Sequence, residues 1–251
     1  MRLPLLLLFL FGFLFMVRAQ DPEPVVSQFN SWFMYFGNHR ISDKWSIHTE
    51  YQWRRAEGIK AWQQSLARVG ADVRTGEHVM LTAGYGYIIS YPYGEQPIPF
   101  TVDEHRLWQQ LILTQTAGRF HIQHRYRLEQ RWVGQKEAGA GGEPVSTGRR
   151  YLNRARYRFF VAIPFNQPRM GKGAWFLALY DEVFLGFGKN VSKKNILDQN
   201  RAYAALGHQF ADNANLQAGY LYHQVFKPDG VRRENNHTLQ LALTYNFDLR
   251  K

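Results

Sequence analysis

Cysteine is missing from this chain of 251 residues. Its absence excludes disulfide bonds, and it also excludes a lipid-modified N-terminal cysteine. Long apolar runs are missing as well, because no segment after the N-terminus approaches the roughly 20 residues that a membrane-spanning helix needs. The apolar periodicity of amphipathic helices is absent too. The sequence therefore excludes a disulfide-stapled scaffold and a helical membrane protein.

The N-terminus has the features of an export signal. Arg2 supplies a positive charge, residues 5–17 form an uncharged apolar run, and Ala19 is the small residue that a signal peptidase reads. An N-terminal membrane anchor is the alternative, but the run is short for a spanning helix. We therefore expect a cleaved signal peptide at 1–19 and a single exported domain at 20–251.

Basic residues outnumber acidic ones, with 31 Lys and Arg against 20 Asp and Glu. A basic, aromatic-rich chain can bind nucleic acid. Here the charges are spread along the chain without forming a patch or tail, and the chain is exported, so no nucleic-acid partner is expected. Aromatic residues make up 16% of the sequence. This content suits a protein with two aromatic girdles at membrane interfaces.

Residues 120–132 alternate strictly between two kinds of side chain. One set is mostly apolar with aromatic ends: Phe120, Ile122, His124, Tyr126, Leu128, Gln130 and Trp132. The other set is polar: His121, Gln123, Arg125, Arg127, Glu129 and Arg131. Successive strand residues face opposite sides, so the pattern fits a soluble sandwich or, inverted, a membrane barrel with charges inside. Export and the recurrence of the pattern, as in residues 45–54, favour the barrel.

The connections between the expected strands alternate between short turns and long loops, as periplasmic turns and extracellular loops do. The connection at 164–173 is the exception, since it is long where a short turn is expected. We find eleven strand-like segments, whereas bacterial barrels have even numbers. The predicted fold is an all-β, antiparallel up-and-down transmembrane barrel of ten to twelve strands, with twelve preferred. Segment 29–40, apolar on both faces, is either irregular or outside a ten-stranded barrel.

The inward faces of these strands carry ten arginines and four glutamates. The expected lumen charges are Glu50, Arg54, Arg68, Glu104, Arg106, Arg125, Arg127, Glu129, Arg131, Arg154, Arg156, Arg158, Glu182 and Arg201. Buried charges must pair, hydrogen-bond or be hydrated. Two interpretations remain open at this point. The charges form an arginine–glutamate lattice that rigidifies the barrel, or the arginine excess makes the lumen favour anions.

Catalytic constellations are weak in this sequence. Ser46 and His48 share a strand face, and Asp103-Glu104-His105 lies near a long loop, although neighbouring strand residues face opposite ways. His121 and His124 also lie on opposite faces, so they cannot form a local metal clamp. We expect no catalytic site, no metal and no cofactor.

Several short polar motifs carry a family resemblance. They are Trp45-Ser46-Ile47-His48-Thr49-Glu50, Asp103-Glu104-His105-Arg106-Leu107-Trp108-Gln109-Gln110, His124-Arg125-Tyr126-Arg127-Leu128-Glu129-Gln130-Arg131, Arg154-Ala155-Arg156-Tyr157-Arg158, Asp181-Glu182-Val183-Phe184 and Asp198-Gln199-Asn200-Arg201. In this order they resemble the bacterial domain-of-unknown-function family numbered 2490. The resemblance implies an exported outer-membrane barrel over nearly the whole mature chain, and it implies no substrate.

The sequence thus predicts a Gram-negative outer-membrane barrel in contact with outer-membrane lipid. Its expected role is structural or that of a narrow, porin-like pore for small anions or polar solutes. One alternative is a barrel enzyme that modifies lipid or peptide at its outer rim. Another is a soluble periplasmic β-barrel that binds a ligand in its cavity.

Overall fold

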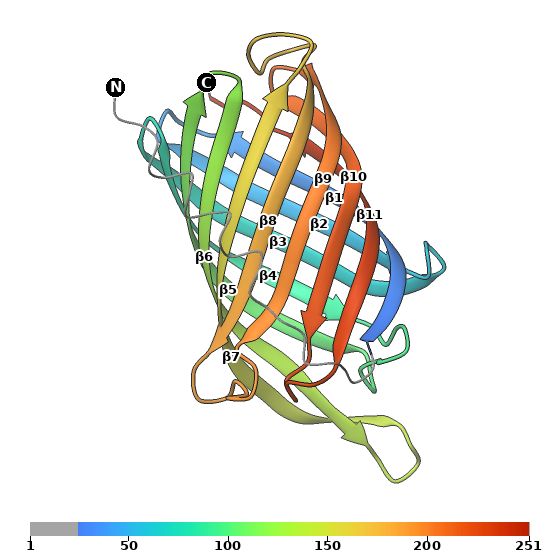
Figure 1. Cartoon of the computed structure of the whole chain (residues 1–251). Coiled ribbons are helices and arrows are strands. Elements are labelled where there is room, and N and C mark those ends of the chain that lie inside the picture. The colour runs from blue at the N-terminus through green and yellow to red at the C-terminus, as the bar shows by residue number, and fades with distance from the viewer. Residues whose placement is uncertain (1–24, 251) are drawn as a thin grey trace.

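The computed structural model describes residues 25–250, and in this part of the chain eleven strands form one closed barrel (Figure 1). The strands are β1 (Val25–Arg40), β2 (Trp45–Ala56), β3 (Ala61–Gly76), β4 (Val79–Ser90), β5 (Val102–Ala117), β6 (Phe120–Ala138), β7 (Pro144–Pro164), β8 (Trp175–Phe187), β9 (Leu197–Ala211), β10 (Ala214–Phe226) and β11 (Arg233–Tyr245). No helix within residues 25–250 is long and apolar enough to cross a membrane. The expected signal peptide at 1–19 lies outside the described residues.

A single parallel pair closes the ring. Consecutive strands pair antiparallel around the barrel, and β1 then pairs in parallel with β11, from Val25 opposite Arg233 to Phe36 opposite Thr244. A parallel closure allows an odd strand number, because the two terminal strands no longer need to run in opposite directions. The eleven strands of the described chain fall within the expected range of ten to twelve. The preferred number of twelve, based on even parity, does not occur.

Segment 29–40 belongs to β1 and is a full barrel strand. The apolar residues on its two faces have different environments. Trp32 points inward and is almost completely buried, whereas Phe33 on the outer face packs against Trp53 at a ring distance of 5.1 Å. The segment therefore looks irregular in the sequence because its inward face carries Trp32, Met34 and Phe36 instead of charges.

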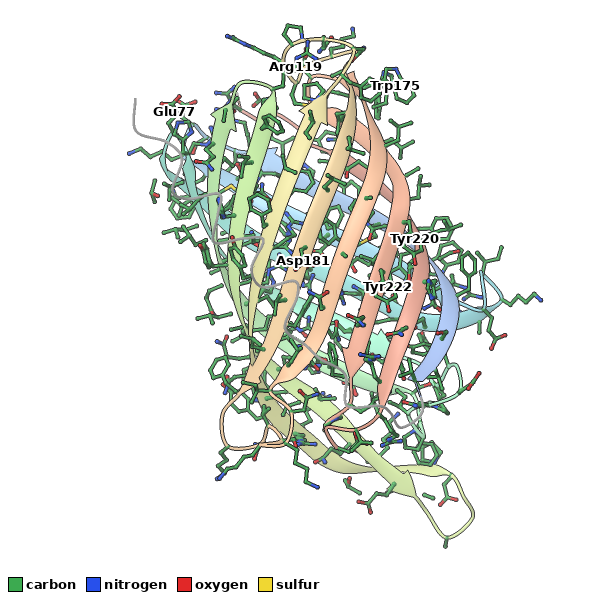
Figure 2. The ribbon with its side chains drawn as sticks, in the orientation of Figure 1. Glu77, Arg119, Trp175, Asp181, Tyr220 and Tyr222 are labelled. Atoms are coloured by element: carbon green, nitrogen blue, oxygen red, sulfur yellow. The ribbon has the colours of Figure 1, made fainter. Side chains whose placement is uncertain are left out.

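Burial along the strands follows the inverted pattern that residues 120–132 predict. On β6, Arg127 and Glu129 are 3% and 0% exposed, while Tyr126 and Leu128 are 46% and 48% exposed. Figure 2 shows side chains projecting both outward from the barrel wall and into its interior. Charged residues thus fill the inside of the barrel, and apolar residues cover its outside.

The two ends of the barrel differ. At the turn end, where β1, β3, β5, β7 and β9 finish, most connections are short, as at 118–119 and 212–213. The opposite end, called the loop end below, carries the longer connections 91–101 and 188–196. Residues 134–148 contain five glycines but are mostly β-structure. There β6 and β7 continue and pair, with Gln135 opposite Gly148, and form a hairpin that extends beyond the barrel wall (Figure 1).

An apolar cluster lies inside the barrel toward the turn end. It consists of Trp32, Ala162, Phe176, Ala178, Tyr203, Ala205 and Leu221. The long β7–β8 connection (165–174) belongs to this region, because its Met170 packs against the cluster. The connection that breaks the alternation of turns and loops therefore covers part of the lumen at the turn end.

Candidate functional site

A cavity of about 590 Å³ runs inside the barrel. Twelve of the predicted lumen charges line it: Glu50, Arg54, Arg68, Arg106, Arg125, Arg127, Arg131, Arg154, Arg156, Arg158, Glu182 and Arg201. The other two, Glu104 and Glu129, are also buried and bind arginines that line the cavity. The cavity and its charges are the candidate functional site.

Six of these arginines contact carboxylates. Glu129 is completely buried, and its Oε1 lies 2.8 Å from Arg156, 3.2 Å from Arg106 and 3.5 Å from Arg68. Its second oxygen lies 3.7 Å from Arg154. One carboxylate therefore lies within 4 Å of four guanidinium groups, and it holds four strands of the wall together from the inside.

The remaining carboxylates extend this lattice around the wall. Arg131 binds Glu104 through two bonds of 2.8 Å, the bidentate geometry that suits a guanidinium. Glu182 accepts hydrogen bonds of 2.7 Å from both Arg125 and Arg156. The lattice is completed by Arg68–Glu50, Arg106–Glu104 and Arg154–Asp198. These contacts are the arginine–glutamate network expected of a rigidified lumen.

Strand register explains why the network does not neutralise every arginine. Arg125 lies directly opposite Arg158, and Arg127 lies directly opposite Arg156. Like charges opposite each other destabilise a sheet unless other groups compensate. Arg125 and Arg156 both bind Glu182 on β8, and their cross-strand neighbours, Arg158 and Arg127, form no ion pair with a carboxylate of residues 25–250.

Four lumen arginines have no carboxylate within 4 Å in residues 25–250, and we call them the unpaired arginines: Arg54, Arg127, Arg158 and Arg201. Neutral glutamine oxygens hold them in place. Arg127 donates to Gln110 at 3.0 and 2.6 Å, and Arg158 donates to Gln123 at 2.6 Å. A glutamine fixes the direction of a guanidinium without cancelling its charge.

Aromatic rings support the same four side chains. Arg54 and Arg201 lie over the Trp32 ring at 3.9 and 5.1 Å, and Arg127 lies over Trp108 at 4.6 Å. Arg158 lies 5.6 Å from the centre of the Tyr180 ring. Cation–π contacts favour the charged form of a guanidinium, again without adding a negative charge.

Trp108 can occupy the lumen because glycines face it. A Cβ atom at Gly84 would lie 2.7 Å from the indole, and one at Gly70 would lie 3.1 Å from it. The two glycines are directly opposite each other on β3 and β4. They leave room for the ring that supports Arg127.

Sequence reasoning missed the partners that distinguish the two groups of arginines. These partners are Gln52, Gln64, Gln110, Gln123, Gln199, Asp198, Trp32 and Trp108. One local signal was available, because Gln52 and Gln199 each precede an arginine by two residues and so share its strand face. The partners on neighbouring strands had no such signal.

The β4–β5 connection (91–101) covers the cavity at the loop end, where Tyr93 and Ile98 line it. Lys227 forms an ion pair with Glu234 and also donates to the carbonyl of Gln96 at 3.4 Å. The Tyr93 hydroxyl donates to Glu234 at 3.4 Å. Burial, and then the negative charge of Glu234, raises the pKa of Tyr93, so the hydroxyl stays protonated as a donor. These contacts fasten the connection to the rim.

The weak catalytic candidates take separate positions. Ser46 and His48 lie on the lumen side, where the His48 ring contacts Trp108 edge-on at 5.1 Å. His105 lies on the outer face, 3.5 Å from Asp103 and bonded to Tyr85, whereas Glu104 points inward. His124 bonds the outward Tyr157 at 2.9 Å. Within residues 25–250, no cluster of three or more potential metal ligands occurs.

Comparison with known proteins identifies one family. A family model described as "Protein of unknown function (DUF2490)" matches residues 29–235, which is most of the chain and nearly all of the barrel. No curated protein and no solved structure matches the chain significantly.

Proposed function

This chain belongs to the DUF2490 family, and we propose that it is a bacterial outer-membrane barrel whose positively charged lumen passes small anions. One observation carries the proposal. The interior holds four buried or nearly buried arginines that line a continuous cavity and form no ion pair with a carboxylate of residues 25–250. Uncompensated charge of one sign in a lumen concentrates ions of the opposite sign.

The outer face supports a location in lipid. Exposed aromatic residues occur at both barrel ends, with Trp45, Phe120 and Trp175 toward the turn end and Trp53 and Trp62 toward the loop end. Such girdles sit at the two interfaces of a membrane, with an apolar band between them.

The few polar side chains on the outer face, within the apolar band, hydrogen-bond with each other. Gln109 and Gln130 exchange two hydrogen bonds, and Asn200 donates to both oxygens of Asp181 at 3.1 and 3.2 Å. Figure 2 labels Asp181 midway along the barrel. Pairing reduces the cost of placing such groups against hydrocarbon.

The cavity also supports a path through the barrel. Its lining includes Asn38 and Asn246 near the turn end and Tyr93 near the loop end. Between them lie the unpaired arginines and their glutamines. A chain of polar groups of this kind replaces part of the hydration shell of a small anion as it passes.

We expect the purified protein in planar bilayers to conduct, with a reversal potential in a KCl gradient that indicates chloride preference of roughly tenfold. The double variant Arg127→Gln with Arg158→Gln should lose most of that preference. Its matched control is Arg55→Gln with Arg74→Gln, since both residues lie on β2 and β3 but outside the cavity lining. Two outcomes would contradict the anion pore and leave the charges with a rigidifying role only. One is a double variant with lower thermal stability and unchanged selectivity, and the other is a wild type without conductance.

The β4–β5 connection should restrict conductance, because it lies over the cavity and is fastened by Lys227, Glu234 and Tyr93. Replacing residues 93–98 by two glycines is expected to raise single-channel conductance several-fold. The matched control shortens the tip of the β6–β7 hairpin at 139–143, which lies away from the cavity. Equal conductance of the wild type and the first variant would show that the connection is no barrier.

A further inference from the structure

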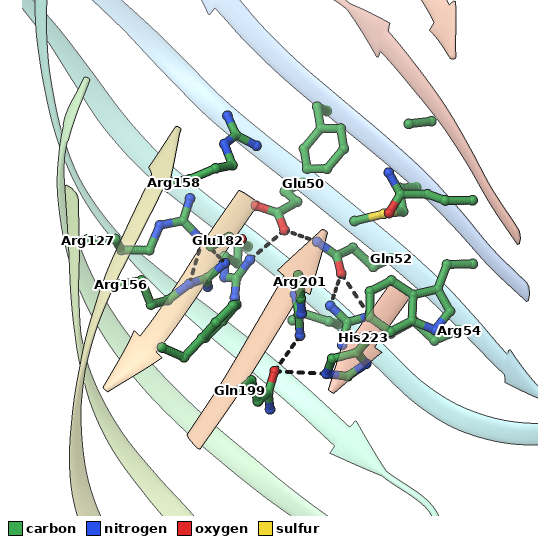
Figure 3. A pocket seen from close by; sticks show the side chains of 18 of the residues that line it. Glu50, Gln52, Arg54, Arg127, Arg156, Arg158, Glu182, Gln199, Arg201 and His223 are labelled. Carbon is green, nitrogen blue, oxygen red and sulfur yellow. Dashed lines mark hydrogen bonds and ion pairs between the residues drawn. The ribbon is translucent and has the colours of Figure 1, made fainter. Parts of the chain in front are cut away.

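Two of the unpaired arginines meet at one buried indole. Arg54 from β2 and Arg201 from β9 lie over the ring of Trp32 from β1. The indole is 1% exposed, and its Nε1 donates to Gln63 at 2.6 Å. Trp32 is therefore held in a defined orientation, and it places two guanidinium groups beside each other in the cavity (Figure 3).

Gln199 is the neutral centre of this arrangement. Its Oε1 accepts a hydrogen bond of 2.8 Å from Arg201 Nη2 and lies 3.1 Å from His223 Nε2. Both contacts are drawn in Figure 3. Arg201 and His223 are 7% and 4% exposed. Arg201 Nε and His223 Nδ1 have no hydrogen-bond partner within residues 25–250. A buried guanidinium N–H without an acceptor is costly, and an oxyanion is the acceptor that fits it best.

A third unpaired arginine, Arg158, lies near Arg201. The register places Arg158, Glu182 and Arg201 directly beside one another on β7, β8 and β9. Glu182 forms its ion pairs with Arg125 and Arg156, so its charge acts on Arg158 and Arg201 only from a longer distance. Arg158 Nε, like Arg201 Nε, has no hydrogen-bond partner in the described chain.

An apolar surface adjoins these donors. Tyr180 stacks on Tyr203 at 4.7 Å, and both rings line the cavity together with Phe160 and Met34. These side chains belong to or pack against the apolar cluster at the turn end. One part of the cavity thus offers guanidinium donors, and the adjoining part offers aromatic and aliphatic carbon.

We propose that the cavity binds a compact organic anion, with its carboxylate or phosphate group between Arg54 and Arg201 and an apolar or aromatic body against Tyr180 and Tyr203. The volume of about 590 Å³ lies within the range of small-molecule pockets. The inference rests on the proposed positive lumen and names its solute class. Inorganic anions can still pass, but they cannot use the apolar surface.

The residue types at the site fit a receptor better than a lattice. A glutamate in place of Gln199 would bind Arg201 more strongly than the glutamine does. A glutamate in place of Gln52 would likewise bind Arg54 more strongly, since Arg54 Nε donates a hydrogen bond of 2.9 Å to Gln52 Oε1. With glutamines there, the guanidinium groups are oriented and keep their charge for an external carboxylate or phosphate group.

The test is Gln199→Glu, which adds an internal carboxylate at nearly constant volume. Benzoate and phenyl phosphate are titrated against detergent-solubilised protein, with acetate and inorganic phosphate as probes that lack the apolar body, and thermal unfolding reports binding. In the wild type, we expect benzoate to raise the unfolding temperature more than acetate at equal concentration. Gln199→Glu should weaken the apparent benzoate affinity at least about tenfold, the loss of one charge-assisted hydrogen bond, and remain folded.

Gln135→Glu is the matched control, since Gln135 is exposed on the β6–β7 hairpin. It should respond to benzoate as the wild type does. Equal responses of the wild type and Gln199→Glu, or equal effects of benzoate and acetate, would overturn the proposal. Because the titration needs no bilayer, its failure with preserved chloride selectivity would remove the organic ligand and leave the proposed function in place. Benzoate binding without any conductance would contradict the proposed anion pore and leave the organic ligand in place.

Discussion

Replacing Glu129 by glutamine is expected to lower the free energy of unfolding by about 3–5 kcal/mol, the usual cost of removing one partner of a buried ion pair. Glu129 is completely buried and lies within 4 Å of Arg68, Arg106, Arg154 and Arg156. Glutamine keeps the shape of the side chain but leaves these positive charges uncompensated. Urea unfolding in lipid vesicles, followed by the mobility of the folded band, measures the change.

Glu77→Gln is the control for that experiment. Glu77 lies in the exposed β3–β4 turn and is labelled in Figure 2. Its substitution should change the unfolding free energy by less than about 0.5 kcal/mol. If Glu129→Gln is equally mild, the lattice contributes little to stability, and the lumen charges have no structural role.

Replacing Leu239 by arginine is expected to cost about 2–4 kcal/mol in a bilayer, the penalty for an arginine on the lipid face near the membrane midplane. Leu239 lies at the centre of β11 and is 52% exposed on the outer face of the barrel. A charged head group cannot reach water from this position without distorting the bilayer. Urea unfolding from phospholipid vesicles is again the measurement.

The control is Leu249→Arg, at an exposed position beyond the end of β11. Near a membrane interface the penalty falls to about 0–1 kcal/mol. A soluble barrel would treat both leucines alike, because each would already face water. Equal, small effects of the two substitutions would therefore support the soluble ligand-binding alternative and contradict a membrane location.

The distinction between interior and exterior residues could be derived from the sequence because it is a local property. In a strand, side chains alternate with a period of two, and any residue on β6 therefore predicts the side of its neighbours. Arg125, Arg127 and Glu129 were placed in the lumen on this basis, and all three are buried there. Segment 29–40 was the exception, since the inward Trp32, Met34 and Phe36 of β1 give it two apolar faces.

Strand number and charge pairing are not local. The parity of the barrel depends on how β1 meets β11, two segments separated by nearly the whole chain, and their parallel pairing is absent from any local pattern. Arg127 and Arg131 look alike in the sequence, on the same face of one strand. Arg131 nevertheless binds Glu104, whereas Arg127 binds Gln110 and remains unpaired.

Composition and alternation were sufficient to predict an all-β chain with arginines inside a barrel, since each of these features depends on residue type and the two-residue repeat. The division of those arginines into six lattice members and four unpaired ones within residues 25–250 arose from contacts between strands. Arg127 meets Gln110 on the neighbouring strand, and Glu182 pairs with Arg125 and Arg156 although Arg158 and Arg201 lie level with it on the adjacent strands. Arg54 and Arg201, separated by most of the sequence, lie over one indole only because the sheet closes on itself. The pattern of residues therefore determined where the charge lies, and closure of the barrel determined which part of it remains unneutralised.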